Sequence, residues 1–276
     1  MRILIFSALA LFVVAANANE CKYNAERKLD IDPKGLQALA FMLGSSDLNV
    51  QGVPGLTQIE VIGKACASEQ ARLAALTLTQ QRDGDVVTVT PHQASGQSLG
   101  LFGSDYAYVD LKVRVPTTLP IRVQTHSGDA MIADVAALDF DSHSGDLILN
   151  RASGAVALSL HSGDVKARDI GPVEVRRSGS GDVDASRVHG AILVGHVGSG
   201  DLQFNDVDQG VHVESVGSGN VTVDRAGGNV MIDAIGSGDI TVTNVGGDFT
   251  VKAVGSGDIH HRNVKGKVDV PKRDDD

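Results

Sequence analysis

The chain has 276 residues, with 24 basic and 34 acidic side chains and a formal net charge of −10 at pH 7. This acidic balance argues against nucleic acid and anionic lipid surfaces as partners. The sequence has three Tyr, seven Phe and no Trp, so the aromatic rings that commonly stack on sugars are scarce.

The segment 1–18 has the pattern of a secretory signal peptide. Arg2 supplies a positive charge, an apolar run extends from residue 3 to residue 16, and Ala16-Asn17-Ala18 has the small-x-small form of a cleavage site. We therefore expect export, with a mature chain that begins at Asn19 and resides in the periplasm, at the cell surface or outside the cell. No later segment is apolar for long enough to cross a membrane, so no transmembrane segment is expected in the mature chain.

The chain contains two cysteines, Cys21 and Cys66. In an oxidising compartment such a pair usually forms a disulfide, and we predict one here. The alternative is a pair of buried free thiols.

Residues 19–125 are predicted to form an irregular β cap at the N-terminal end. In chain order, its signals are an outlying coil at 44–50 with later inward positions at Val53, Ile59 and Val61, a hairpin around Asp83-Gly84, a polar loop at 92–104, and a strand at 106–115 with Val109, Leu111, Val113 and Val115 on one face. A cap is expected because the end strands of a stacked fold would otherwise be open edges.

Residues 126–270 carry a short repeat. A Ser-Gly-Asp or Ser-Gly-Asn tripeptide occurs eight times, beginning at Ser127, Ser144, Ser162, Ser180, Ser199, Ser218, Ser237 and Ser256. The spacing of these serines is nearly constant. A short, fixed period of this kind is typical of a stacked repeat protein.

Within one repeat, apolar residues fall at positions 5, 7, 10, 14, 16 and 19, counted from the residue before Ser-Gly-Asp. In the coil at 236–254 they are Ile240, Val242, Val245, Phe249, Val251 and Val254. This alternation predicts two short strands per coil, and hence an all-β fold: a β-solenoid of about 19-residue coils over 126–270, followed by a charged tail at 271–276. The glycines at positions 1, 3 and 12 are expected at corners that need a positive φ or a close backbone approach.

Position 9 predicts a charge ladder. In successive coils it reads Asp134, Arg151, Asp169, Arg187, Asp206, Arg225, Asn244 and Asn263. Stacking would place each of the charges between neighbours of opposite sign, which would disfavour a slip of one coil.

Position 4 holds a column of carboxylates with no compensating bases: Asp129, Asp146, Asp164, Asp182, Asp201, Asp239 and Asp258, interrupted by Asn220. One interpretation is that each Asp accepts backbone N–H groups in an Asx-type turn, which Asn220 can also do. The other is a divalent cation such as Ca²⁺. We expect the turn and no metal.

Position 1 is glycine in five coils but histidine in three, namely His126, His143 and His161. Stacked imidazoles could contact a metal or an acidic partner, or the ladder could be an exposed replacement for glycine. We expect no metal here, because ligands usually come from non-equivalent positions. The adjacent pair His260-His261 is predicted to point to opposite faces of a strand.

The Gly-Ser-Gly-Asp turns, the two short strands per coil and the strand Val113-Arg114-Val115-Pro116 before the first repeat together resemble an exported bacterial β-strand-repeat family of unknown function, related to the head GIN domains of candidate autotransporter adhesins. The resemblance covers about residues 40–270. It implies a single-stranded, right-handed β-helix similar to pectin-lyase-like folds, adhesion or surface assembly, and no established catalytic residues. Histidine in place of the first-corner glycine departs from the pattern.

These observations predict a non-catalytic, exported β-solenoid that acts as a binding, adhesion or scaffold module, with an envelope protein or polysaccharide as partner and no cofactor. The alternative is a β-helix enzyme, a polysaccharide lyase or hydrolase, that uses the Asp face. Catalytic carboxylates need unlike environments, whereas a repeated column offers like ones. A uniform surface would favour binding, and one break where unlike polar residues converge would favour an enzyme. The sequence looks uniform.

Overall fold

The computed structural model describes residues 21–92 and 106–271. The predicted signal peptide, most of the predicted 92–104 loop and most of the charged tail lie outside these residues. The described part is nearly all β and contains one short helix, α1 (Gln70–Ala75).

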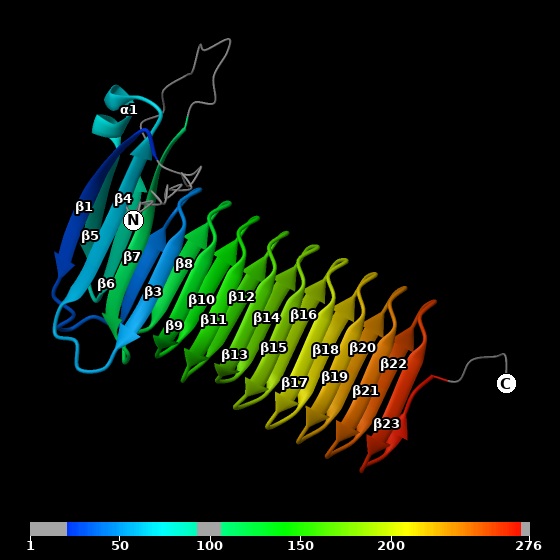
Figure 1. The fold of residues 1–276 in the computed structure, drawn as a ribbon. Coiled ribbons are helices and arrows are strands. Elements are labelled where there is room, and N and C mark those ends of the chain that lie inside the picture. Colours follow the sequence, from blue (N-terminus) through cyan, green and yellow to red (C-terminus); the bar gives the residue numbers. More distant parts are fainter. Residues whose placement is uncertain (1–20, 93–105, 272–276) are drawn as a thin grey trace, which may run out of the picture.

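The repeats form two parallel sheets that face each other along one long stack (Figure 1). One sheet contains β9 (Ala130–Val135), β11 (Leu147–Ala152), β13 (Val165–Ile170), β15 (Val183–Val188), β17 (Leu202–Val207), β19 (Val221–Ala226), β21 (Ile240–Val245) and β23 (Ile259–Val264). The other contains β8 (Ile121–Thr125), β10 (Leu138–Ser142), β12 (Val156–Leu160), β14 (Val173–Ser178), β16 (Ile192–Val197), β18 (Val211–Val216), β20 (Val230–Ile235), β22 (Phe249–Val254) and β24 (Val268–Asp269). The predicted β-solenoid is therefore confirmed.

The apolar columns of the repeat form the core between the two sheets. Val242 is fully buried and Val251 is 3% exposed, so the predicted inward positions are confirmed. Equivalent residues of successive coils pair in register, for example Val223 with Val242. Each coil therefore extends the core by one layer of valine, isoleucine, leucine or phenylalanine, as a pleated, buried surface prefers.

The cap continues both sheets at their N-terminal ends. β3 (Leu48–Val53) lies between β9 and β7 (Ala107–Pro116), and β2 (Ala38–Met42) lies between β8 and β6 (Val86–His92). Beyond them, β7 pairs with β4 (Ile59–Ala67), β4 pairs with β1 (Tyr23–Ile31), and β6 pairs with β5 (Thr77–Asp83), all antiparallel. The predicted hairpin is present, with Gly84 at a φ of 60° in its turn.

One expectation for the cap was wrong, and one element of the cap was not predicted. Ile59 and Val61 are buried, but they belong to antiparallel β4 rather than to the second strand of the outlying coil. That coil takes its second strand from β2, which precedes it in the chain. Helix α1 was missed, because its six residues are too few to establish a 3.6-residue period.

Of the two reasons expected for glycine at the corners, a positive φ and a close backbone approach, the second applies. None of the repeat glycines in the described chain has a positive φ; the positive values, between 53° and 61°, belong instead to the eight residues at position 9. The turn glycines are needed for close approach. At position 3, an added Cβ would lie between 1.8 and 2.1 Å from a carbonyl oxygen of the preceding turn. A side chain there would force the coils apart.

The charge ladder at position 9 consists of separate pairs. Arg151 contacts Asp134 at 2.6 Å, Arg187 contacts Asp169, and Arg225 contacts Asp206. In each pair the arginine reaches back to the preceding coil. The predicted order of charges is confirmed, since Arg187, for example, lies between Asp169 and Asp206 and both raise its pKa. The direct contact is made to one side only, because one guanidinium engages both oxygens of a single carboxylate.

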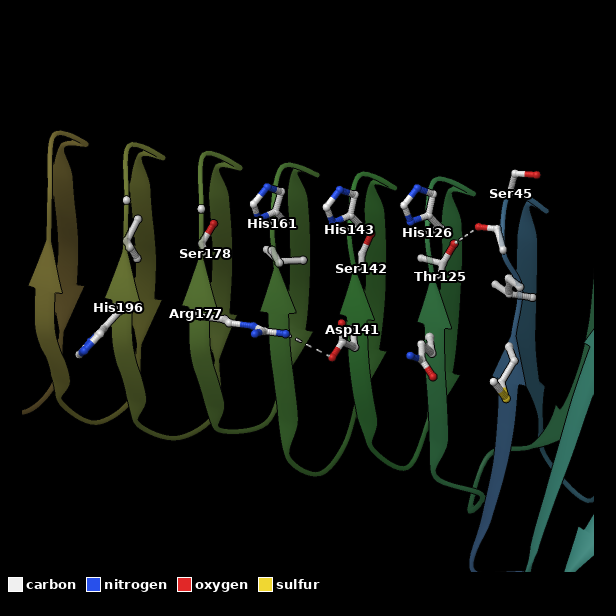
Figure 2. Close-up of a pocket in the computed structure, with 18 of the residues that line it drawn as sticks. Ser45, Thr125, His126, Asp141, Ser142, His143, His161, Arg177, Ser178 and His196 are labelled. Carbon is white, nitrogen blue, oxygen red and sulfur yellow. Dashed lines mark hydrogen bonds and ion pairs between the residues drawn. The ribbon is translucent and has the colours of Figure 1, made fainter.

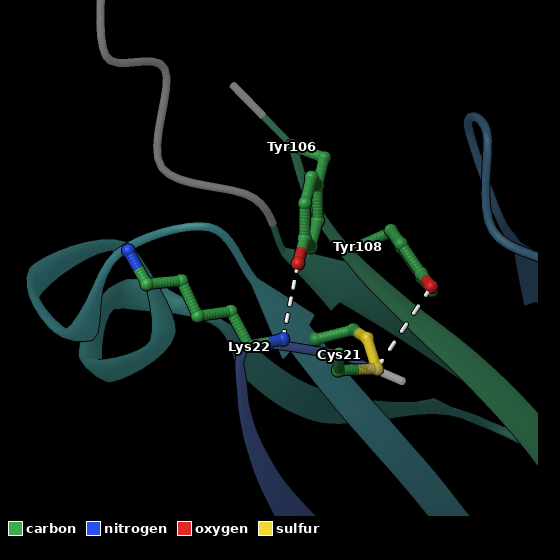
Figure 3. The surroundings of a disulfide bond; sticks show 5 residues. Cys21, Lys22, Tyr106 and Tyr108 are labelled. Atoms are coloured by element: carbon green, nitrogen blue, oxygen red, sulfur yellow. Dashed lines mark hydrogen bonds between the residues drawn. A yellow bond between two sulfur atoms is a disulfide. The ribbon is translucent and has the colours of Figure 1, made fainter. Parts of the chain in front are cut away.

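The predicted disulfide between Cys21 and Cys66 is present, with a Cα–Cα distance of 5.5 Å (Figure 3). It fastens the chain before β1 to the buried end of β4. Next to it, the backbone N–H of Lys22 donates to the hydroxyl of Tyr106 at 3.0 Å. None of the described residues forms a helix long and apolar enough to cross a membrane.

Candidate functional site

The aspartates at position 4 form a ladder of hydrogen bonds between coils. In each step, the carboxylate of one coil accepts the backbone N–H of the position-4 residue in the next coil. For example, Asp182 Oδ1 accepts from Asp201 N at 2.8 Å, and Asp201 Oδ1 accepts from Asn220 N at 2.8 Å. The column begins in the cap, where Asp47 Oδ1 accepts from Asp129 N at 3.0 Å.

This ladder bears on the two interpretations of the column. The carboxylates accept backbone N–H groups, as the turn interpretation requires, but the donor lies in the next coil rather than in the same turn. The amide of Asn220 continues the ladder, because its Oδ1 accepts from Asp239 N at 2.9 Å. In the described chain, no three His, Cys, Asp or Glu residues are grouped so that they could hold a metal ion.

The three position-1 histidines form a stacked ladder just past the ends of β8, β10 and β12, directly before the Ser-Gly-Asp turns (Figure 2). The ring centroids of His126 and His143 are 4.8 Å apart, and those of His143 and His161 are 4.5 Å apart, with interplanar angles of 4° and 5°. A metal bound to a ring nitrogen lies close to the plane of that ring. Parallel, stacked rings are therefore poorly placed to share one ion.

The turns that carry these histidines are firmly held. Buried Thr125 accepts a hydrogen bond from Gly128 N at 3.1 Å, and buried Ser142 accepts one from Gly145 N at 2.8 Å. The backbone N–H of His161 donates to Ser142 O at 3.0 Å. The spacing of the rings is thus set by hydrogen bonds within and between the coils rather than by the flexible side chains themselves.

The length of the preceding strand distinguishes the coils with histidine at position 1 from the later coils with glycine there. The strands β8, β10 and β12 each have five residues, whereas β14 and the next four strands of this sheet have six. The extra residue enters as a register shift between β12 and β14, where Ser159 pairs with Arg177. After this bulge, a Cβ at position 1 would lie only 2.2 to 2.4 Å from a carbonyl oxygen of the preceding turn, as at Gly179.

The bulge also changes the outer face of the sheet. An inserted residue leaves two neighbouring side chains pointing outward, and in β14 these are Arg176 and Arg177, which are both exposed. They reach across β12 to the carboxylates of β10. Arg176 contacts Asp139 at 2.9 Å and Arg177 approaches Asp141 at 3.7 Å.

A groove of about 1130 Å³ lies where the histidine ladder meets this altered face. Seven adjacent strands, from β6 through β2, β8, β10, β12 and β14 to β16, contribute to its lining. Six inter-strand spacings of about 4.8 Å give it a length of about 29 Å. Its polar side chains include those labelled in Figure 2: Ser45, Thr125, His126, Asp141, Ser142, His143, His161, Arg177, Ser178 and His196.

The charged groups of the groove differ from those of the ladders. Asp141 is the one carboxylate among the described lining residues, and it faces Arg177. His196 has Glu214 of β18 3.8 Å from its Nδ1. The carboxylates with depressed pKa values lie elsewhere: a hydrogen bond from Arg151 lowers the pKa of Asp134, and one from Lys252 lowers the pKa of Asp233.

The sequence predicted only part of this site. It identified the histidine ladder but not Asp141, Arg177 or His196, and it suggested a uniform surface, which was wrong. One signal could have located the break: position 1 changes from histidine to glycine between His161 and Gly179. The serine spacing could not, because it is 18 residues both before Ser162 and after it.

The pair His260-His261 lies apart from the groove. His260 pairs with outward Thr241 and His261 pairs with inward Val242, in agreement with their predicted opposite faces.

The Toastrack DUF4097 family matches residues 58–276. The chain belongs to this family. The match includes all the regular coils and most of the cap, and it begins just before β4. No curated protein matches the chain at a significant level.

Several solved structures are similar to this family member over most of its length. A candidate cell adhesion protein from Clostridium sporogenes is 13% identical, with 91% of this chain and 100% of that chain covered and a TM-score of 0.28. A candidate adhesin from Bacteroides fragilis is 14% identical, with coverage of 91% and 98% and a TM-score of 0.38. A candidate lipid-binding protein from Parabacteroides distasonis is 13% identical, with coverage of 90% and 97% and a TM-score of 0.39.

Proposed function

We propose that this Toastrack protein is an exported, non-catalytic binding module of the cell envelope or surface, and that the histidine-lined groove is its contact surface. One observation carries the proposal: the repeat is interrupted by the register shift between β12 and β14, and side chains from seven strands converge in the groove beside it. A relation to head GIN domains and a role in adhesion belong to the same proposal.

A break in the repeat where unlike polar residues converge was the feature expected of a β-helix enzyme, so the groups in the groove must decide between the two functions, and they support binding rather than catalysis. Glycan hydrolysis uses two carboxyl groups with separated pKa values, whereas Asp141 is the one carboxylate among the described lining residues and is paired with Arg177. The stacked imidazoles occupy equivalent positions and therefore have similar environments. An open, elongated groove with a row of imidazole groups suits a linear partner that makes the same contact with several coils.

The test is retention of the mature protein on immobilised envelope polysaccharide and envelope protein fractions at pH 7.5. Gln124→Trp would place a large side chain in the groove, and Gln203→Trp is the matched control on the outer face of the opposite sheet. We expect one fraction to retain the wild type and the Gln203→Trp control but not the Gln124→Trp variant. Equal retention of both variants would contradict the assignment of the groove, and shortening of the bound polymer would contradict a non-catalytic role.

A further inference from the structure

The groove presents an ordered set of groups that can become cationic. Histidine is the side chain whose charge ordinarily changes between about pH 5 and pH 8. Three of the groove's histidines stand in one row at 4.5 to 4.8 Å spacing, and His196 lies two strands beyond the row. The neighbouring strands β2 and β6 contribute uncharged groups, such as Met42 and Thr90.

We propose that the groove binds a linear acidic polysaccharide and that binding is coupled to protonation of the histidine ladder. This inference rests on the proposed binding function and names the partner class and its control. The occupant is a chain of sugars with repeated carboxylates, aligned with the stacking axis. Its carboxylates contact the imidazoles, and its hydroxyls contact the exposed amide of Gln124.

The coupling follows from the spacing of the rings. Two unit charges 4.5 to 4.8 Å apart repel by just under ~1 kcal/mol in water. His143 has such a neighbour on each side, so a fully charged row carries this repulsion twice. A row of carboxylates along the groove offsets this repulsion. By linkage, a ligand that favours the protonated row binds more tightly as the pH falls, and protons are taken up on binding.

The other charged groups nearby do not reverse this sign. Asp141 faces Arg177 at 3.7 Å, so the pair has no net charge. Glu214 lies 3.8 Å from Nδ1 of His196, which is outside the row. The position-4 aspartates of the same turns line a different pocket, which contains Asp129, Asp146 and Asp164. The groove therefore becomes cationic on an otherwise acidic protein.

A polysaccharide fits this surface better than an acidic peptide. The rings are held at an almost constant spacing of 4.5 to 4.8 Å by the backbone of successive coils. In an extended peptide, side chains on one face recur only every two residues, about 6.6–6.8 Å apart, so acidic side chains cannot follow the row one for one. The groove is also open, with Gln124 and Asp141 exposed along it, so the hydroxyls of a sugar chain can form hydrogen bonds beside the row.

The experiment is isothermal titration calorimetry of the mature protein with polygalacturonate at pH 5.5 and pH 7.5, at one ionic strength and in two buffers of different ionisation enthalpy. Fully methyl-esterified polygalacturonate tests the charge, and poly-glutamate tests the sugar. The groove variant is His126→Gln/His143→Gln/His161→Gln. The matched control changes three histidines that do not line the groove: His189→Gln/His212→Gln/His260→Gln. Thermal unfolding establishes that both variants are folded.

We expect polygalacturonate to bind about tenfold more tightly for each pH unit lowered if one proton is taken up, with no binding of the ester. The groove variant should lose the pH dependence and the control should keep it. Equal affinity at both pH values, normal binding by the groove variant, or equal binding of poly-glutamate would overturn the inference. If these results fail but an envelope fraction is still retained through the groove at pH 5.5 or pH 7.5, the proposed function stands while this inference fails; if no fraction is retained at either pH, both fail.

Discussion

Substitution of Gly219 by alanine tests the close approach of successive turns. The added Cβ would lie 1.9 Å from the carbonyl oxygen of Gly200, whereas real Cβ atoms essentially never approach closer than 3.0 Å. The two turns must therefore separate by more than 1 Å. Ser46 occupies the same column in the first coil of the stack, so a side chain is tolerated only where no earlier turn lies beneath it.

The cost can be worked out from the hydrogen bonds that join these turns. Ser218 N donates to Gly198 O at 2.9 Å, and Asn220 N donates to Asp201 Oδ1 and Leu202 N to Asn220 O, both at 2.8 Å. A 1 Å separation stretches all three beyond the range of a normal hydrogen bond. At about 1 kcal/mol each, the loss is about 3 kcal/mol, or a decrease in Tm of about 6–12 °C for a domain of this size.

The assay is urea and thermal unfolding followed by circular dichroism. Ser218→Ala is the matched control, because this side chain is exposed in the same turn, and it should change stability by less than about 0.5 kcal/mol. A cost below about 1 kcal/mol for Gly219→Ala would refute the reasoning, since the coils would then tolerate a side chain at their closest contact.

Three further predictions concern the ladders and the cap. Asp201→Asn should leave the unfolding free energy nearly unchanged because the amide oxygen can still accept, whereas Asp201→Ala should cost about 1 kcal/mol; a rise in Tm with millimolar Ca²⁺ and equal harm from both variants would instead support a cation site. Arg151→Gln should raise the pKa of Asp134, which the Arg151 hydrogen bond depresses, as followed by carboxyl NMR shifts. A depressed folded-state pKa contributes stability that is present above the unfolded pKa and is lost as the pH falls through the folded pKa. The Arg151→Gln variant should therefore lose less stability than the wild type on acidification. An unchanged dependence of the unfolding free energy on acidic pH would contradict the pairing. Reduction of the Cys21–Cys66 disulfide should lower the unfolding free energy by up to about 4 kcal/mol, from the entropy of a loop of 45 residues, and an unchanged Tm in reductant would show that the cap does not depend on the bond.

The sequence alone was sufficient to predict the repeat, the inward columns and the disulfide. The repeat and the inward columns depend on local alternation and on the period of the chain: Val242 and Val251 occupy inward positions in a coil whose apolar pattern recurs along the stack. The disulfide followed instead from two cysteines in a chain with an export signal. The hairpin at Gly84 was likewise predictable, because its turn residues are adjacent in the chain.

Only the tertiary structure decided which groups meet across coils. The Asp201 carboxylate was expected to accept a hydrogen bond within its own turn, but it accepts one from the backbone N–H of Asn220 in the next coil. Within the described repeats, the positive φ values belong to position 9 rather than to the glycines. The groove arises because one inserted residue near Arg177 shifts the register of a single strand pair. Such contacts depend on the stacking of whole coils, so an insertion of one residue alters the side chains of several neighbouring strands at once, while the local apolar pattern remains almost the same.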